Sequence, residues 1–293
     1  LRSTGTTKNY ITASQLSRGM LDRTRSFSGA SWQNIYSLNK GATSTYFLNA
    51  SGTGFFAVRG QEGVPDNDIS DSLSANYKFD EDLNIGIPTT YDASGSSNTG
   101  SLVGSPVRTS STCVLSNCLQ FNGTTMYVNI PTPLRNFPTA AITVSAWVRP
   151  QANVTNNDWV LNNFASVGGW NLYSDAGGAV YFGVLSGAGP RNASGCAAAF
   201  TLNKYHFLTG TYDGQTVKVY VDGVLCPTTS ALAGQTLYTA GAVQIGERDT
   251  AGASTHHIDD ARIYSRSFSE DEIARLYNSS PFSRYFYAED VCR

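Results

Sequence analysis

Short stretches of alternating apolar and polar residues dominate the chain between residues 73 and 278. The clearest is TGTYDGQTVKVYVDGVL at 209–225, where valines recur at every second position between two Asp-Gly pairs. Asp-Gly is a favoured pair in tight hairpin turns, so this segment predicts a β-meander. Similar stretches separated by turn residues include ITVSAWVRP, GWNLYSD, AVYFGVL and HIDDARIYS. Many short strands at this spacing predict an antiparallel β-sandwich.

Two other segments have the apolar spacing of helices. One covers residues 12–25, and the other is FSEDEIARLYN, in which Glu272 follows Ser269 by three positions. A Ser-x-x-Glu pair before an apolar stripe is a capping box, so a helix is predicted to begin at Ser269. Two aromatic-rich segments, 43–48 and 54–59, flank the turn-forming NASGTG and predict a β-hairpin.

The order of these elements predicts two units, one inserted in the other. Residues 61–72, QEGVPDNDISDS, are acidic and rich in turn formers, which indicates a boundary. The aromatic stretch at 282–291 predicts a strand that needs a sheet, and the hairpin at 43–59 offers one. We therefore expect a sandwich at 73–278, inserted into a small α+β unit made of 1–72 and 279–293, since insertion is easy where a domain's termini are adjacent.

Composition narrows the possible partners. Charged residues make up 14% of the chain and the formal net charge is −2. No broad electrostatic field therefore attracts nucleic acid or anionic lipid. No run reaches the length of about 18 apolar residues that a membrane-spanning helix needs. Because the chain starts at Leu1, we expect a processed or truncated product.

Five cysteines predict two disulfides and one leftover thiol. Cys113 and Cys118 are five positions apart, which is consistent with a disulfide that closes a small hairpin. Cys196 and Cys226 are predicted to bridge two neighbouring strands, and Cys292 is left without a partner in the chain. Disulfides of this kind indicate an oxidising compartment, so we expect an extracellular or cell-surface protein.

Several segments between 73 and 278 carry a family resemblance. In chain order, YKFDED, LQFNGTTMYVNIP, ITVSAWVRP, HFLTGTYDGQTVKVYVDGV and HIDDARIYSRSFSEDEIARLYN resemble the laminin-G-like, concanavalin-A-like jelly rolls of bacterial surface proteins. The resemblance implies a mainly β protein with a jelly-roll sandwich. This fold hosts lectins, adhesion modules and a few enzymes.

The flanking segments carry a second resemblance. SWQNIYSLNKGATSTYFLN, GFFAVRG and SRYFYAEDVCR resemble the globular part of type IV pilin-like proteins, or pseudopilins. Such proteins begin with a long apolar helix, which this chain lacks. The resemblance therefore implies that a membrane and filament-core helix preceded Leu1, and that the protein self-assembles into a filament through that helix.

The first resemblance also implies a calcium ion. The loop DASGSSNTG at 92–100 supplies oxygen ligands, and strict alternation along HIDDARIY places Asp259 on the core side of its strand. In the resembling jelly rolls these two segments lie side by side, which implies a structural Ca²⁺ held by Asp92, Asn98, Gly100 and Asp259. The alternative is an Asx-turn loop that is hydrogen-bonded to Asp259 without a metal.

Four aromatic residues form a candidate ligand platform. Trp159, Trp170, Tyr173 and Tyr181 occupy positions that often place rings at a sheet surface, where sugars stack. The alternative is that each ring packs in the core or at a sheet edge. Trp147, in SAWVRP, is expected in the core.

The sequence offers little support for catalysis. Glycoside hydrolysis needs paired carboxylates in a cleft, and no strand has the Glu-x-Asp-x-x-Glu pattern. His256 and His257 are expected as an exposed pair in a turn. We therefore expect no enzyme, but a surface-displayed adhesion or carbohydrate-binding module whose partner is a glycan or a cell-surface protein. The alternatives are a structural filament subunit with a decorative sandwich, or a polysaccharide-cleaving enzyme.

Overall fold

The chain divides into two compact units, residues 1–67 and 68–293. This computed structural model describes residues 46–51, 54–59, 72–81, 88–114, 116–122, 125–131, 134–151, 158–163, 167–238, 241–246 and 255–278. In the first unit, β1 (Tyr46–Ser51) and β2 (Gly54–Arg59) pair antiparallel, with Ser51 opposite Gly54. The predicted hairpin is therefore confirmed, although its first strand begins at Tyr46.

Three other predictions for the pilin-like unit lie outside the described residues. They are the helix at 12–25, the returning strand at 282–291 and the unpaired Cys292. The inserted arrangement that depends on them stays a prediction.

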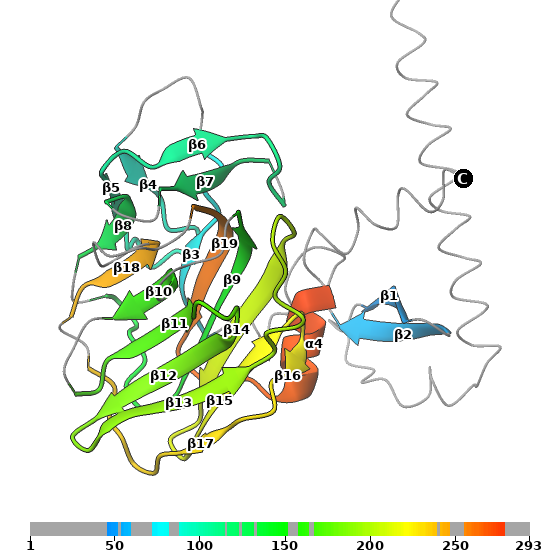
Figure 1. Cartoon of the computed structure of the whole chain (residues 1–293), viewed down its shortest axis with the longest axis vertical. Helices are drawn as coiled ribbons and strands as arrows, with labels where there is room; N and C mark the ends of the chain where they lie inside the picture. The colour runs from blue at the N-terminus through cyan, green and yellow to red at the C-terminus, as the bar shows by residue number, and fades with distance from the viewer. Residues whose placement is uncertain are drawn as a thin grey trace, which may run out of the picture. The chain divides into compact units, whose positions relative to one another are not determined.

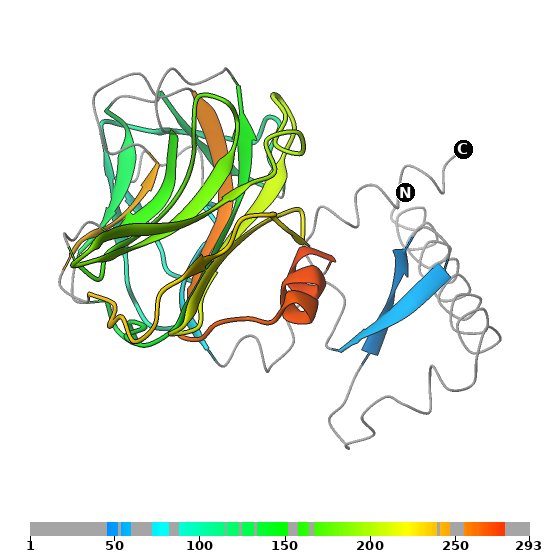
Figure 2. The same cartoon turned by 60° about the horizontal axis from the view of Figure 1, so that its bottom comes forward.

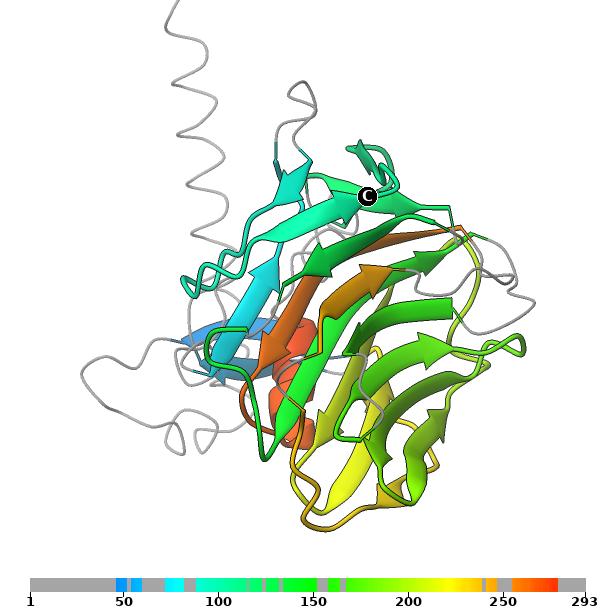
Figure 3. The same cartoon turned by 90° about the vertical axis from the view of Figure 1, so that its left-hand side faces the viewer.

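The second unit contains two antiparallel sheets, which confirms the predicted sandwich (Figure 1). Figures 2 and 3 show its curved strands from two other sides. One sheet has eight strands in the order β13-β12-β11-β10-β18-β8-β5-β4. Their bounds are β4 (Thr89–Thr90), β5 (Gly100–Val103), β8 (Tyr127–Ile130), β10 (Asp158–Asn163), β11 (Trp170–Ser174), β12 (Val180–Ser186), β13 (Gly189–Gly195) and β18 (Val243–Gly246).

The other sheet has nine strands, seven of them in the order β16-β15-β14-β9-β19-β7-β6, with β17 beside β15 and β3 beside β19. Their bounds are β3 (Leu73–Tyr77), β6 (Val107–Thr109), β7 (Cys118–Phe121), β9 (Ile142–Pro150), β14 (His206–Tyr212), β15 (Thr216–Val221), β16 (Val224–Leu225), β17 (Ser230–Ala231) and β19 (His256–Tyr264). The predicted meander is formed by β14, β15 and β16.

The two sheets bury one continuous apolar core between them. Trp170 and Phe182 enter it from the eight-stranded sheet, and Val144, Val219 and Ile263 enter it from the nine-stranded sheet. Each of these side chains is fully buried, so the alternating sequence pattern correctly predicts that these positions face the core.

The outer face of the nine-stranded sheet carries a second apolar cluster beneath α4 (Glu270–Asn278). Trp147, Phe207 and Tyr264 come from the sheet, and Ile273 and Leu276 come from the helix. Trp147 is therefore buried as expected, but in this second cluster. In the described parts of the chain, no helix is long and apolar enough to cross a membrane.

The capping box that begins α4 is confirmed. The Ser269 N–H donates to Glu272 Oε2 at 2.8 Å, and the Glu272 N–H donates to Ser269 Oγ at 3.3 Å. Burial alone would raise the pKa of Glu272, but hydrogen bonds from Arg266 and Ser269 outweigh it and lower the pKa to about 2. The carboxylate therefore stays charged and holds the helix start in place.

The expectation of an exposed histidine pair is wrong. His256 and His257 lie in β19, and their exposed fractions are 0% and 4%. Both are buried because β9 and β7 flank this end of β19. His256 Nδ1 lies 3.0 Å from Asp158 Oδ1. Burial, with the charges of Arg149 and His256, lowers the pKa of His257 to about 4.

This lowered pKa predicts a loss of stability in mild acid. An unfolded chain binds a proton at His257 near pH 6.5, whereas the folded chain binds it only near pH 4. The contribution of His257 is therefore fully present above pH 6.5 and declines as the pH falls toward 4. At pH 5 the free energy of unfolding should be about 2 kcal/mol lower than at pH 7.5 on this account.

Urea unfolding at both pH values checks this prediction, with His257→Gln as the comparison. The variant should lose that part of the pH dependence, because it has no proton to bind. An equal pH response in the variant would contradict the assignment to His257.

Candidate functional site

The loop from Asp92 to Gly100 is closed by hydrogen bonds to its own chain. Asp92 Oδ1 accepts from the N–H groups of Asn76 and Ser94, both at 2.9 Å, and Oδ2 accepts from the N–H of Asn98 at 3.0 Å. Both oxygens of Asp92 therefore have protein donors, in the manner of an Asx-turn.

Asn98 connects the same loop to two other segments. Its side-chain amide donates to the Ser74 carbonyl at 3.0 Å, and its amide oxygen accepts from the Arg135 N–H at 2.9 Å. The Tyr77 hydroxyl donates to the Asn98 carbonyl at 2.5 Å. Gly100 begins β5, where an added Cβ would lie 2.6 Å from a Val128 methyl carbon, so close packing accounts for this glycine.

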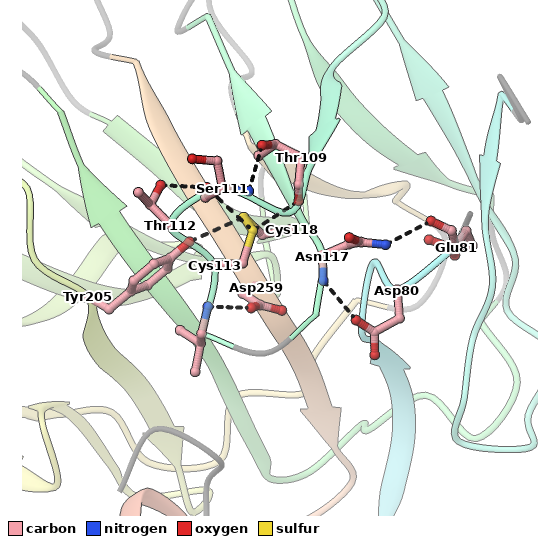
Figure 4. The surroundings of a disulfide bond; sticks show 11 residues. Asp80, Glu81, Thr109, Ser111, Thr112, Cys113, Asn117, Cys118, Tyr205 and Asp259 are labelled. Carbon is pink, nitrogen blue, oxygen red and sulfur yellow. Dashed lines mark hydrogen bonds between the residues drawn. A yellow bond between two sulfur atoms is a disulfide. The ribbon is translucent and has the colours of Figure 1, made fainter. Parts of the chain in front are cut away.

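Asp259 is buried as predicted, but not on the core side. A register shift in β19 between Asp259 and Arg262, with a positive φ of 48° at Asp260, marks a β-bulge. Ile258 and Ala261 both face the core, so strict alternation fails between them. Asp259 instead lies opposite Trp147, and its Oδ2 accepts from the Val114 N–H at 3.0 Å (Figure 4).

The structure therefore brings together only part of the predicted calcium set. Asp92 and Asn98 share a loop at the edge of β3, whereas Asp259 lies with Val114 and Trp147 near the α4 cluster. Among the described residues, no group of three or more His, Cys, Asp or Glu side chains is placed to hold a metal ion. The predicted set also contains Asn98 and Gly100, which such a group does not include, so calcium stays a proposal.

Chelation decides this proposal. Asp92→Ala should lower the free energy of unfolding by about 2–3 kcal/mol even in EDTA, because three N–H groups lose a charged acceptor. Urea unfolding with calcium and with EDTA measures both effects. Asp213→Ala, which removes a carboxylate from a hairpin turn, is the control.

If calcium raises the free energy of unfolding of wild type and of Asp213→Ala, but not of Asp92→Ala, an ion at the loop is supported. No response in wild type would mean that hydrogen bonds alone close it.

Both predicted disulfides are present. Cys113–Cys118 closes the short turn that places Val114 over Asp259, and the Tyr205 hydroxyl donates to Cys118 Sγ at 3.4 Å (Figure 4). Cys196–Cys226 joins the end of β13 to the residue that follows β16, so it links the two sheets.

Three of the four predicted platform residues form an aromatic ladder. Trp159, Tyr173 and Tyr181 lie directly opposite one another on β10, β11 and β12, on the outer face of the eight-stranded sheet. Figure 1 shows these strands side by side, in green. The ring centroids of Trp159 and Tyr173 are 4.8 Å apart, and those of Tyr173 and Tyr181 are 4.9 Å apart with an interplanar angle of 8°.

A second bulge turns Trp159 outward. The register of β10 with β11 shifts between Trp159 and Leu161, so Val160 is the extra residue. Leu161 and Val160 both face the core, and Trp159 then joins Tyr173 on the other side. Trp170 is a correction: it lies on the core face of β11 with 0% exposure and cannot meet a surface ligand.

The ladder's hydroxyl groups are held by polar partners. The Tyr181 hydroxyl donates to Asp175 Oδ2 at 2.9 Å, and the Tyr173 hydroxyl accepts from Asn192 Nδ2 at 3.5 Å. Burial, with the nearby Tyr181 and Asp175, raises the pKa of Tyr173 to about 12. The hydrogen bond to Asp175 raises the pKa of Tyr181. Both rings therefore stay protonated and uncharged near neutral pH.

Next to the ladder runs an amide row that sequence reasoning missed. Five carboxamide residues occupy adjacent register positions on the same outer face, with the bare Gly183 between the first two: Asn192, Asn171, Asn162, Gln244 and Asn129. Asn171 lies in a segment predicted as a strand, GWNLYSD, but the strands that carry Asn162 and Asn192 were not predicted. The row is visible only once the pairing of all these strands is known.

Comparison with known proteins gives matches at two levels, a sequence family and solved structures. A family model described as the concanavalin A-like lectin/glucanases superfamily, Laminin_G_3, matches residues 122–274. No curated protein sequence matches the chain.

Solved structures share the fold at low sequence identity. The binding domain of botulinum neurotoxin serotype D matches with a TM-score of 0.58 and 17% identity, covering 72% of this chain and 52% of that one. The binding domain of Paraclostridial Mosquitocidal Protein 1 matches with a TM-score of 0.58 and 16% identity, covering 72% and 53%. This chain thus spans about half the length of those binding domains.

Proposed function

The chain belongs to the concanavalin A-like lectin/glucanases superfamily, and from this membership we propose that it is a surface-displayed adhesion or carbohydrate-binding module. The binding surface in this proposal is the ladder face, meaning the outer face of the eight-stranded sheet around Trp159, Tyr173 and Tyr181. The ligand is a glycan, free or carried by a cell-surface protein.

The aromatic ladder is the observation that carries the proposal. Trp159 and Tyr181 are partly exposed at its two ends, and Tyr173 is buried between them. The stacked rings give a rigid apolar strip, and polar side chains flank it on the same face. Apolar rings combined with a few fixed polar groups are typical of small-molecule and sugar sites.

The ligand classes named for the structural neighbours are consistent with this proposal. One of them is a structure of botulinum neurotoxin type C, whose cell entry is described as dependent on interaction with two ganglioside molecules. Another is a botulinum neurotoxin binding domain in complex with rat synaptotagmin II. A ganglioside is a sugar-bearing lipid and synaptotagmin II is a protein, and binding is what the two descriptions have in common.

Binding without cleavage fits the chemistry of the ladder face better than hydrolysis does. A glycosidase needs two carboxylic groups across the scissile bond. Among the described residues of the ladder and the amide row, the one adjoining carboxylate is Asp175, and it accepts the Tyr181 hydroxyl. Asp158 lies in β10 but pairs with His256 on the core side. A polysaccharide-cleaving enzyme is therefore the weaker candidate.

The setting of this module is the second part of the proposal. Two disulfides favour an extracellular location, and the resemblance of the flanking segments to pilin-like proteins favours display on a filament. A structural filament subunit with a decorative sandwich is the alternative. It predicts that the ladder residues can be replaced without any effect on binding.

Replacement of Trp159 tests the proposed function. Trp159→Leu should weaken binding by at least about tenfold for the glycans that the wild-type protein binds, which corresponds to about 1.4 kcal/mol. The reason is that the substitution removes the indole ring on which a sugar would stack. A glycan array identifies the ligands, and titration calorimetry gives the dissociation constants.

Tyr91→Leu is the matched control, since Tyr91 is 57% exposed and lies outside the ladder. It should bind as wild type does. Unchanged binding by Trp159→Leu, with Tyr91→Leu also unchanged, would favour the decorative sandwich or another binding surface.

A further inference from the structure

The turn that Cys113–Cys118 closes contributes a side chain to the apolar cluster beneath α4. Val114 is 5% exposed and belongs to that cluster. Its N–H donates to Asp259, which lies opposite Trp147 on the neighbouring strand (Figure 4). The ring centroid of Trp147 is in turn 5.7 Å from that of Tyr277 in α4. The disulfide-closed turn is therefore connected to the helix through a short series of contacts.

α4 depends on this cluster for its stability. The helix has nine residues, whereas an isolated helix shorter than about 12–15 residues is only marginally stable in water. Ile273 and Leu276 anchor it by their burial in the cluster. Lys218 and Glu270 form an ion pair between the sheet and the helix at 3.3 Å, but both side chains are partly exposed, so the pair adds little. Loss of one cluster member therefore loosens the helix.

The backbone of the turn favours its withdrawal once the disulfide opens. The pairing of β6 with β7 ends where Thr109 lies opposite Cys118, so the residues between them are outside the sheet. Thr112 and Ser116 have φ angles of 62° and 51°. Residues other than glycine rarely adopt such angles, and for a β-branched threonine they are especially unfavourable. Without the covalent closure the turn can leave this conformation, which moves Val114 out of the cluster.

The disulfide is open to attack from one side. Cys118 is 0% exposed, whereas Cys113 is partly exposed and follows two exposed residues. A thiolate therefore attacks Cys113 Sγ, a new S–S bond forms there, and Cys118 leaves with the electron pair of the broken bond. The Tyr205 hydroxyl donates to Cys118 Sγ at 3.4 Å and stabilises this leaving thiolate. Burial raises the pKa of Tyr205, so the hydroxyl keeps its proton.

The other disulfide has a different place in the fold. Cys196–Cys226 joins residues 30 positions apart and links the two sheets, whereas Cys113–Cys118 joins residues five positions apart. A disulfide that closes a short loop contributes less to the stability of the whole chain than one that closes a long loop. Opening the shorter one therefore leaves both sheets paired and changes only the turn and what packs on it.

We propose that Cys113–Cys118 is a redox switch for the packing of α4. A dithiol reductant opens it in two exchange steps, in which the dithiol is oxidised to a disulfide and the two cysteines are reduced to thiols. The turn then withdraws Val114, and α4 loosens on the sheet. Reoxidation closes the turn and restores the helix. This proposal does not depend on which ligand the ladder face binds.

The test opens the disulfides of the full wild-type chain with increasing concentrations of dithiothreitol. Alkylation with iodoacetamide and peptide mass mapping show which cysteines are reduced. Cys113 and Cys118 should be labelled at lower concentrations than Cys196 and Cys226. In that range, amide hydrogen exchange of α4 should become at least about tenfold faster, while exchange of β11 and β12 stays unchanged. Removal of the reductant and reoxidation should restore slow exchange.

Three substitutions test the individual steps. Val114→Ala should speed the exchange of α4 in the oxidised protein, because it removes the side chain that links the turn to the cluster. Val107→Ala is the matched control, since Val107 is 51% exposed on the adjoining β6, and it should leave α4 unchanged. Tyr205→Phe keeps the ring but removes the donor to Cys118, so it should slow the opening by about threefold.

The contrary outcomes are distinct. Unchanged exchange of α4 after Cys113–Cys118 has opened would overturn the switch. Equal acceleration of α4, β11 and β12 would also overturn it, because the disulfide would then stabilise the whole sandwich. Opening of Cys196–Cys226 at the same or a lower dithiothreitol concentration would overturn the selectivity that the switch requires. An unchanged opening rate in Tyr205→Phe would overturn the role of that hydroxyl.

Discussion

The backbone pairing of β19 is the constraint on which the sandwich depends. This strand pairs with β9 along most of its length, with β7 near its start and with β3 near its end. Its core side contributes Ile258 and Ile263 to the space between the sheets, and its other side contributes Tyr264 to the cluster under α4. One strand therefore holds two separate apolar layers in register.

The bulge in β19 makes this double role possible. The extra residue lets apolar side chains fill the core on both sides of Asp260 while Asp259 turns toward Val114. The guanidinium of Arg262 donates to the carboxylate of Asp260, the residue with positive φ, and Arg262 also donates to the Tyr264 hydroxyl. Polar contacts within the strand thus stabilise a backbone conformation that few side chains favour.

Much of this fold could be predicted from local patterns, because those patterns report local physics. The alternating valines of β15 and the reciprocal Ser269–Glu272 capping contacts each depend on residues a few positions apart. The bulges at Val160 and Asp260 had no such signal. A bulge exchanges the faces of the residues that follow it, which is why Asp259 was assigned to the core side. The two histidines were misplaced for another reason, because the flanking strands β7 and β9 that bury them are distant in the sequence.

The candidate site was predictable only in its parts. Tyr173 and Tyr181 stood out as aromatic residues on strands, yet Trp170 in the same segment faces the core. The amide row joins residues from 129 to 244, and its members become neighbours only through the register of five strand pairs. Asparagine also favours turns, so its presence inside strands carried little weight in the sequence.

The disulfide at the end of β13 has a mechanical consequence. β13 is an edge strand that pairs along its length with β12, and on its other edge Ser194 exchanges two backbone hydrogen bonds with Thr228. It carries Asn192 beside the ladder. A ligand pulled away from this face would load that edge, and an edge strand peels by losing one hydrogen bond after another. Cys196 follows the last residue of β13 and is bonded to Cys226 beyond β16, so force at that end passes covalently into the other sheet. A load on the end of β13 is thereby shared by both sheets.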